Sequence, residues 1–271
     1  MVVFEIIDNS DKQKHLLGYL FYFERSKRFF TELLAEYDEW TCPFIFSGFV
    51  KKGIYNIGSE WSRKFVEQRI VPPDRQNLGM ILKDNNLKEY DEYRLLVLSE
   101  GRCAQDELSV LKISENALVP EITERLNKKV QDLLPLDGNK LLIFFKDGRQ
   151  AIFDCGKHLK TDRRFLKVLS DPDIFNNVHV TPGGNGIEWG KERCVPAEDL
   201  YSLSKKATVT YQQMLAFLKT RTIDTTEAAT ILDCSRQYIG QLAKQGKLTP
   251  VHVESNNSLF LRSDLESENN V

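Results

Sequence analysis

The feature that most constrains the fold is a pair of short helix patterns in residues 223–245, separated by a tight turn. Asp224 precedes the first pattern and Glu227 follows three positions later, which is the spacing of a capping box at a helix N-terminus. The small and apolar residues that follow are Ala228, Ala229, Ile231 and Leu232. Small side chains allow close approach, so the pattern predicts a second helix packed directly on the first.

The second helix pattern begins at Ser235, after a turn at Asp233 and Cys234, and ends at Gly246. One face of this helix carries Ile239, Leu242 and Ala243, and the other carries Arg236, Gln237, Tyr238, Gln241 and Lys244. A helix-turn-helix requires this division, with one stripe buried and polar side chains offered to base edges. Arginine suits guanine and glutamine suits adenine by bidentate geometry.

Residues 223–265 also resemble the excisionase and MerR-type family of winged helix-turn-helix proteins. The matching residues are Thr225-Thr226-Glu227-Ala228-Ala229, Leu232, Ser235-Arg236, Ile239, Leu242, Gly246-Lys247-Leu248, Pro250, His252-Val253 and Arg262-Ser263-Asp264-Leu265. The resemblance implies binding to duplex DNA with a wing beside the recognition helix. The family commonly has Gly and several Arg in the wing, whereas residues 254–258 here read Glu-Ser-Asn-Asn-Ser. Strong anchoring by the wing is therefore not expected.

These patterns predict DNA contacts from the start of the first helix, from the second helix and from the wing. The predicted residues are Thr225, Thr226, Ser235, Arg236, Gln237, Tyr238, Gln241, Lys244, Lys247, Asn256, Asn257 and Arg262. The first helix would offer backbone N–H groups to a phosphate. The alternative is a helical hairpin that only packs or dimerises, because such pairs do not always touch DNA.

The charge distribution limits how tightly this module can hold a phosphate backbone. The whole chain has a net charge of −2, and residues 205–271 contain 8 Lys and Arg against 7 Asp and Glu. Non-specific affinity scales with the number of cations presented, so a monomer should bind double-stranded DNA weakly. We therefore expect a homodimer.

Upstream, the residues predict a small α+β unit. A hairpin is expected from residues 141–145 and 150–153 around Asp147-Gly148, followed by a helix at 163–169 and a strand at 178–180. Residues 183–186 should turn into another strand at 187–189.

The run from about residue 130 to 203 resembles the DUF2442 family of small bacterial domains. Its matching residues are 142–145, Asp147-Gly148, Phe153-Asp154, 165–169, 171–175, 178–180, 184–189 and 199–201. The resemblance implies a compact α+β domain of a kind often found beside DNA-binding or toxin-antitoxin modules. Residues 190–194 are inserted where such domains have a short turn, which leaves the end of the unit open.

The N-terminal residues predict a further α+β unit. A hairpin is expected from residues 16–23 and 28–34, and a closing strand at 108–113. Between them the expected helices span residues 40–50, a stretch capped by Ser59, a stretch after Pro72-Pro73, and residues 89–98. Residues 61–113 are similar to the N-terminal subdomain of HipA-type toxins, a non-catalytic lobe, which implies a protein partner. The alternative is that Arg69, Arg75, Arg102 and Asp106 form buried or half-buried ion pairs that fix helix ends.

Together these patterns predict a multidomain α+β protein. Two small α+β units, residues 1–115 and 130–203, are followed by a helix-turn-helix with a short wing in residues 207–271. The first functional hypothesis is a sequence-specific DNA-binding transcriptional regulator. The alternative is an antitoxin-type interaction protein that binds a partner through its N-terminal domain and autoregulates through the DNA module; an adjacent reading frame for a kinase or nuclease would favour it.

Other function classes find little support. No signal peptide and no membrane span is predicted, and the five scattered cysteines lack disulfide or metal-ligand spacing, so we expect a cytoplasmic protein with no membrane association. No catalytic residue, metal or cofactor is predicted. Asp154 and His158 lack a third partner, Glu188 and Lys191 fall on opposite faces of a strand, and residues 183–186 lack the lysine of a phosphate loop.

Overall fold

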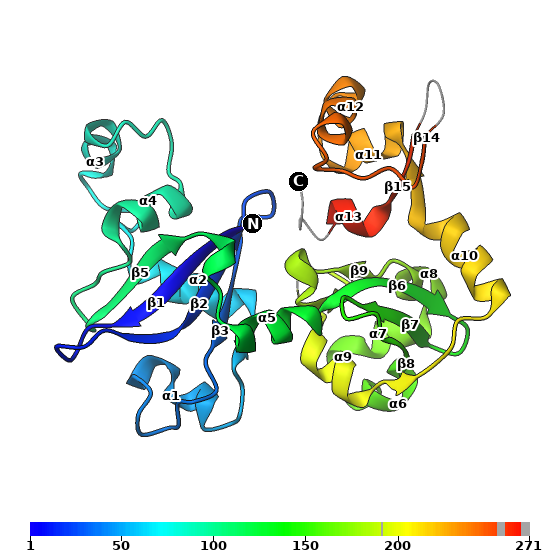
Figure 1. Cartoon of the computed structure of the whole chain (residues 1–271), viewed down its shortest axis with the longest axis horizontal. Coiled ribbons are helices and arrows are strands. Elements are labelled where there is room, and N and C mark those ends of the chain that lie inside the picture. Colours follow the sequence, from blue (N-terminus) through cyan, green and yellow to red (C-terminus); the bar gives the residue numbers. More distant parts are fainter. Residues whose placement is uncertain (191, 254–257, 267–271) are drawn as a thin grey trace. The chain divides into compact units, whose positions relative to one another are not determined.

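The computed structural model describes residues 1–190, 192–253 and 258–266. The chain divides into two compact units, Met1–Thr123 and Glu124–Val271, and each combines helices with antiparallel sheets (Figure 1). The predicted α+β class is therefore confirmed. Within the described ranges, no helix has the length and apolar character needed to cross a membrane.

The first unit is built on one five-stranded antiparallel sheet. In spatial order its strands are β4 (Asn56–Ile57), β3 (Arg28–Leu33), β2 (His15–Phe23), β1 (Val2–Asp8) and β5 (Leu108–Ile113). The predicted hairpin is β2–β3, with Phe23 opposite Arg28, and the predicted closing strand is β5, paired with β1. The helices are α1 (Phe44–Val50), α2 (Ser59–Glu67), α3 (Leu78–Asp84), α4 (Glu92–Ser99), a 3₁₀ turn η1 (Glu115–Ala117) and α5 (Pro120–Asn127).

Two predicted helices of this unit begin later than expected. The carboxylate of Asp38 accepts hydrogen bonds from the backbone N–H groups of Trp40 (2.9 Å) and Thr41 (2.8 Å) and holds this segment in a turn. The ring of Pro43 also disfavours the helical conformation of the residue before it, so α1 starts only after Pro43. Similarly, α4 starts after Asp91, which caps it by accepting from Arg94 N–H at 3.1 Å.

The proposed ion pairs of this unit are realised in one case. The Arg69 guanidinium is fully buried, lies 3.7 Å from the centre of the Phe65 ring and pairs with Asp106. Asp106 also accepts from the backbone of Leu108 at 3.1 Å, so the pair ties the end of α2 to the start of β5. Arg102 also forms an ion pair at a helix end, with Glu100 after α4 at 3.0 Å, but this pair is exposed and not buried as expected. Arg75 is exposed and donates to Asn77, so its predicted ion pair was wrong.

The first part of the second unit, residues 130–206, consists of two small antiparallel sheets around one core. We call it the preceding domain, because it precedes the C-terminal module in the chain. The first sheet has the order β12 (Lys205–Lys206), β8 (Gln150–Asp154), β7 (Lys140–Phe145) and β6 (Val130–Leu136), and the second has the order β11 (Cys194–Pro196), β10 (Gly186–Glu188) and β9 (His179–Val180). The predicted hairpin is β7–β8. The helical elements are α6 (Cys155–His158), η2 (Arg163–Phe165), α7 (Leu166–Ser170), α8 (Pro172–Asn176), η3 (Pro182–Gly184) and α9 (Ala197–Leu203).

The glycine-rich run is a buried turn that packs on β6. Gly184 has φ of +73°, and a Cβ built there would lie 2.0 Å from the carbonyl oxygen of Val130. Only glycine fits such a close backbone approach in the left-handed region. Asn185 closes the turn by donating from its side chain to the Pro182 carbonyl at 2.8 Å. The turn reading of this segment therefore explains its glycines without a bound phosphate.

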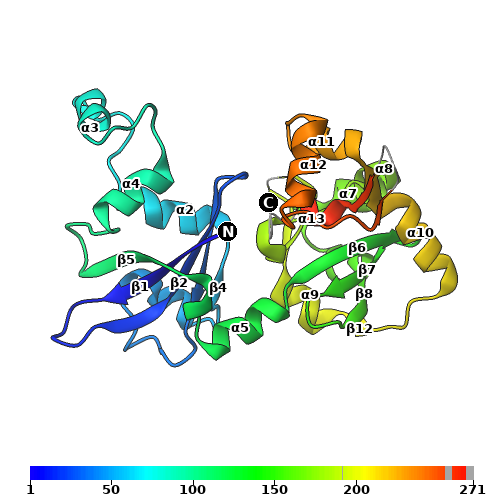
Figure 2. The ribbon, with the colours of Figure 1, turned by 45° about the horizontal axis from the view of Figure 1, so that its top comes forward.

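The last part of the second unit forms a module with a core of its own. Its elements are α10 (Tyr211–Arg221), β13 (Thr222–Asp224), α11 (Thr225–Ile231), α12 (Arg236–Lys244), β14 (His252–Val253), β15 (Ser258–Leu261) and α13 (Arg262–Glu266). The strands pair in the order β13, β15, β14. Figure 2 shows the chain passing from β12 through α10 toward α11. The core gathers buried side chains of Ile223, Ala228, Ile239, Leu242 and Phe260.

A half-buried lysine lies against the glycine turn. The Lys146 ammonium, just after β7, donates to the Gly183 carbonyl at 2.9 Å. Burial, together with the charge of Lys129, lowers the pKa of Lys146 to about 8. Because the uncharged amine is favoured in the folded state, this lysine makes stability depend on pH.

Replacing Lys146 with Met should remove that dependence. The unfolded chain keeps the ordinary pKa of 10.5, so between pH 8 and 10.5 it binds a proton that the folded state has released. The free energy of unfolding of the wild-type protein should therefore rise with pH, by roughly 2 kcal/mol from about pH 7 to about pH 10, and the variant should lack this rise. Urea unfolding followed by circular dichroism measures this, with the exposed Lys140→Met on β7 as the control. Equal pH slopes for wild type and Lys146→Met would contradict the assignment.

Candidate nucleic-acid interface

The two helices α11 and α12 begin at the residues that the sequence indicates. Asp224 accepts from the backbone N–H groups of Thr226 (2.7 Å) and Glu227 (2.8 Å), and the Glu227 carboxylate accepts in return from the Asp224 N–H at 3.3 Å. The predicted capping box is confirmed. Ser235 caps α12, because its hydroxyl accepts from the backbone of Tyr238 at 3.2 Å.

A tight turn sets the approach of the two helices. Asp233 adopts φ of +48°, and the N–H of Cys234 donates to the Ala229 carbonyl at 3.0 Å, so the chain reverses within the few residues between the helices. Ala228 and Ala229 are buried in the shared core, where their small side chains leave space for Ile239 of α12. The hydrophobic effect thus fixes which face of α12 turns inward.

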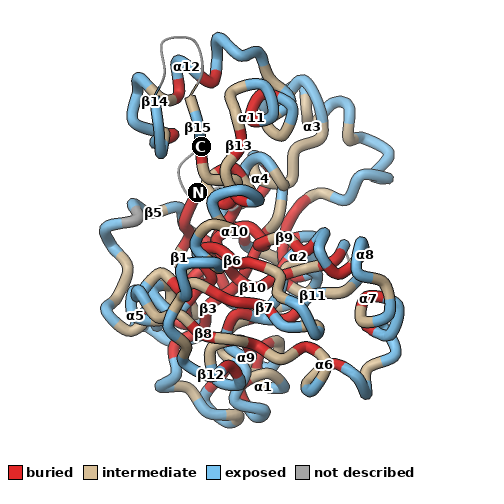
Figure 3. Tube along the Cα trace, turned by 90° about the vertical axis from the view of Figure 1, so that its right-hand side faces the viewer, coloured by how far each residue is buried: buried red, intermediate tan, exposed pale blue. Residues whose placement is uncertain are grey.

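The opposite face of α12 is exposed. Ile239 and Leu242 are 0 % and 1 % exposed, whereas Tyr238 is 48 % exposed. The polar side chains on the exposed face are Arg236, Gln237, Gln241 and Lys244, and Lys247 follows the helix, also exposed. Figure 3 shows α12 as a largely exposed segment marked by a few buried positions. The structure therefore gathers on one surface the members of the predicted set that belong to this helix.

The wing and the first helix are placed beside this surface by one sheet. β15 pairs with both β13 and β14, and β13 leads directly into α11. The Thr225 hydroxyl lies 3.3 Å from the carbonyl oxygen of Ser258 and 3.2 Å from its nitrogen, so it joins α11 to the wing strand, while Thr226 is exposed. Two further predicted contacts, Asn256 and Asn257, lie outside the described residues.

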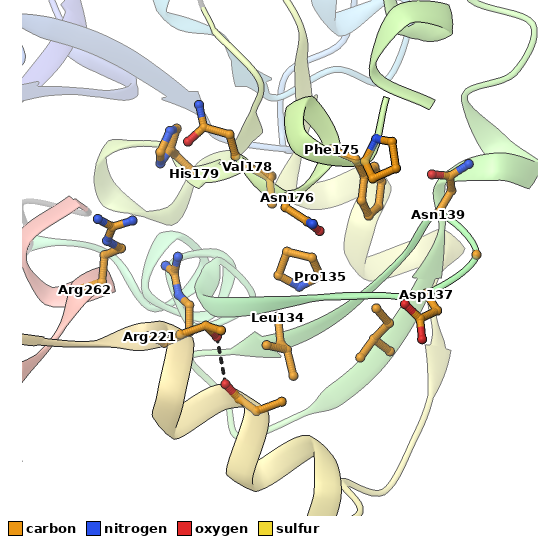
Figure 4. A pocket seen from close by; sticks show the side chains of 16 residues that line it. Leu134, Pro135, Asp137, Asn139, Phe175, Asn176, Val178, His179, Arg221 and Arg262 are labelled. Atoms are coloured by element: carbon orange, nitrogen blue, oxygen red, sulfur yellow. Dashed lines mark hydrogen bonds between the residues drawn. The ribbon is translucent and has the colours of Figure 1, made fainter. Parts of the chain in front are cut away.

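Arg262 lies at a different place from the rest of the predicted set. It opens α13, its Nε atom is buried, and that atom lies 3.8 Å from a carboxylate oxygen of Glu266. In Figure 4 its side chain lies at the same end of a pocket as His179 of β9 and Arg221 of α10. We therefore leave Arg262 out of the candidate interface.

A buried ion cluster joins this module to the preceding domain. The Arg221 side chain, at the end of α10, is 6 % exposed and donates from Nε to Asp132 of β6 at 2.9 Å and from a terminal nitrogen to Glu266 of α13 at 3.1 Å. Nδ1 of His179, on β9, lies 3.2 Å from the same carboxylate of Glu266. Four elements of the second unit therefore meet in one network.

The two carboxylates of the cluster respond differently to their surroundings. Burial raises the pKa of Asp132 and outweighs the opposing charge of Arg221. Burial also acts to raise the pKa of Glu266, but the hydrogen bond to His179 and the charges of Arg221 and Arg262 together lower it. Glu266 is thus the carboxylate that the surrounding cations hold in its charged form.

Two of the other sequence candidates for chemistry, Asp154 and His158, make structural contacts. Asp154 caps α6 by accepting from the Lys157 N–H at 2.8 Å, and His158 stacks on the Phe153 ring with centroids 5.3 Å apart. Lys191, considered together with Glu188, lies outside the described residues. Across residues 1–190, 192–253 and 258–266, no group of three or more His, Cys, Asp or Glu is arranged to hold a metal ion. Burial raises the pKa of the Cys42 thiol to about 11 and that of Cys155 to about 12.

No family model, curated protein or solved structure matches this chain. The resemblances to winged helix-turn-helix proteins, to DUF2442 domains and to the HipA-type subdomain therefore stay predictions. The sequence did not indicate the cluster around Arg221, because its partners are far apart along the chain. A charged residue in the strand β6 was its one local signal.

Replacing Arg221 with Met should destabilise the second unit. The variant leaves two buried carboxylates without their guanidinium, and breaking a buried pair in this way costs roughly 3–5 kcal/mol. Lys219→Met on the same helix removes an exposed charge and should change the free energy of unfolding by less than about 0.5 kcal/mol. Urea unfolding followed by hydrogen exchange of peptides from the second unit measures both variants. Similar unfolding midpoints for the two would refute the role of the cluster.

Proposed function

We propose that the chain is a sequence-specific DNA-binding protein, acting as a transcriptional regulator, whose α12 enters the major groove. One observation carries the proposal: α12 buries one apolar stripe and exposes Arg236 and Gln237 at its N-terminal end. Side chains at this end of a recognition helix contact base edges in helix-turn-helix complexes. Duplex DNA as the target, together with scattered cysteines that lack disulfide spacing, places the protein in the cytoplasm in this proposal.

The surroundings of α12 support DNA binding over a purely structural hairpin. A helix pair that only packs also has a polar solvent face, so the support comes from which polar residues this face carries. The segment 235–248 carries three cations, Arg236, Lys244 and Lys247, and no carboxylate. The strand pair β14–β15 is joined to the start of α11 through Thr225 and Ser258, and in the proposal it serves as the wing.

A second candidate function is an antitoxin-type protein that binds a partner through its first unit. The observation that favours it is a pair of exposed aromatic side chains before and at the start of α1, since Trp40 is 86 % exposed and Phe44 is 95 % exposed. Exposed Trp and Phe are costly in water and are enriched in protein interfaces. In this candidate the DNA module serves autoregulation, so both candidates share the same helix α12.

Arg236→Ala combined with Gln237→Ala should abolish specific binding. Each bidentate base contact is worth about 1–3 kcal/mol, so the double variant should lose at least about 30-fold in affinity for its preferred duplex. A duplex selected from a randomised pool, tested by mobility shift, gives the readout. The matched control is Arg163→Ala with Gln212→Ala, two exposed residues outside α12. No enriched sequence, or unchanged binding by the double variant, would overturn the proposal.

The DNA-bound form should be a homodimer. Three cations per recognition segment give little affinity for phosphates, and a dimer doubles both the charge and the base contacts. The exposed side chains of Tyr211, Met214 and Leu218 form a stripe along α10 that offers an apolar contact. Footprinting should show two related half-sites about 34–36 Å apart. Sedimentation of a monomer at micromolar concentration, with protection of one half-site, would speak against it.

A further inference from the structure

The second unit contains a pocket of about 500 Å³ that neither the DNA module nor its core requires. It lies between the β6–β7 turn, the segment from α8 to β9, helix α10 and the start of α13. Pockets that hold small molecules have volumes of this order, from about 300 to 1,000 Å³. The volume of the pocket is therefore that of a small-molecule site.

The lining is polarised along its length. Figure 4 shows His179, Arg221 and Arg262 at one end, and Asn139 and Asp137 at the other. Two guanidinium groups at one end and amide or carboxylate groups at the other would orient a ligand that carries one anionic head. Arginine presents a planar fork that matches carboxylate and phosphate oxygens.

Arg221 and Arg262 differ in how far the protein already satisfies them. Arg221 is bonded to Asp132 and Glu266, so its role in the pocket is structural. The Nε of Arg262 is buried, lies 3.8 Å from the nearest Glu266 oxygen and makes no hydrogen bond within the described part of the chain. The side chain as a whole is 35 % exposed, so the terminal N–H groups of the guanidinium, and not the buried Nε, are the donors that an incoming anion would meet.

The rest of the pocket is apolar or neutral. Leu134 and Pro135 of β6 form one wall, and Phe175 and Val178 contribute the opposite one, with Asn176 between them (Figure 4). Apolar surface of this kind favours an organic body over a hydrated inorganic ion. The combination of walls and cationic end selects a small molecule with an apolar body and one acidic head.

We propose that this pocket binds a small organic acid, with its carboxylate at Arg262 and its body between Pro135 and Phe175. The ligand would touch α10 and α13, which belong to the module that carries α12, and also β6 and β9 of the preceding domain. Binding itself does not depend on the proposed function. The consequence that the acid regulates DNA binding does rest on it, because only then does the position of α12 matter.

The test is a titration of the full chain in the absence of DNA. The probes are benzoate, phenylacetate, succinate and glutarate, each paired with its amide, together with inorganic phosphate. Isothermal titration calorimetry should detect at least one carboxylate with a Kd below about 1 mM, and its amide should bind at least about 10-fold more weakly. Stronger binding of phosphate than of every carboxylate, or equal binding of acid and amide, would overturn the proposal.

Two variants place the ligand in the pocket. Arg262→Gln removes the guanidinium that would bind the carboxylate, and Ala216→Leu fills space on the α10 side of the pocket. Each should weaken the carboxylate at least about 10-fold, while the exposed Arg163→Gln should leave it unchanged. Circular dichroism checks that each variant is folded. If Arg262→Gln does not fold, Ala216→Leu alone still tests the site. Wild-type affinity in both variants, or no bound carboxylate at all, refutes the site whether or not the protein binds DNA.

Discussion

The second unit depends on the ion pairs of one buried arginine. Arg221 is the last residue of α10, and its almost fully buried guanidinium binds Asp132 of β6 and Glu266 of α13. A charge removed from water in this way is tolerated only when every partner is in place. The geometry of this one side chain therefore requires β6, α10 and α13 to be folded together, so two hydrophobic cores behave as one compact unit.

The junction also bears on α12. The helix shares one core with α11, β15 and α13, and α13 carries Glu266 of the cluster. The intact cluster thus sets one direction for the exposed face with Arg236 and Gln237 relative to the preceding domain. Base recognition needs such fixed side-chain positions, because a misplaced hydrogen-bond donor loses its discrimination.

The sequence was informative where local physics decides the structure. Capping by Asp224 and Ser235, and small residues between two helices, act within a few positions, so α11 and α12 could be predicted. The strand β6 could not, because Asp132 in a strand suggests a surface position, and its burial depends on an arginine 89 residues away. The helix α10 was missed although the sequence carries a local signal for it, the capping box of Thr210 and Gln213. The displaced position of Arg262 could not be predicted, because it depends on the packing of α13 against the distant strand β9.

In the proposed regulator, the modest charge of the DNA module makes its affinity for DNA sensitive to the arrangement of the junction. A protein that makes many phosphate contacts binds DNA so tightly that a small change in conformation alters its occupancy little. In the proposed complex with DNA, residues 235–248 bring three cations, so most of the specific affinity would come from a few base contacts. A coupling free energy of about 1–3 kcal/mol then changes affinity by roughly 5- to 150-fold. A ligand that contacts α10, α13 and β6 at once needs only that much preference between two arrangements of the junction, and a single carboxylate–guanidinium contact lies in this range.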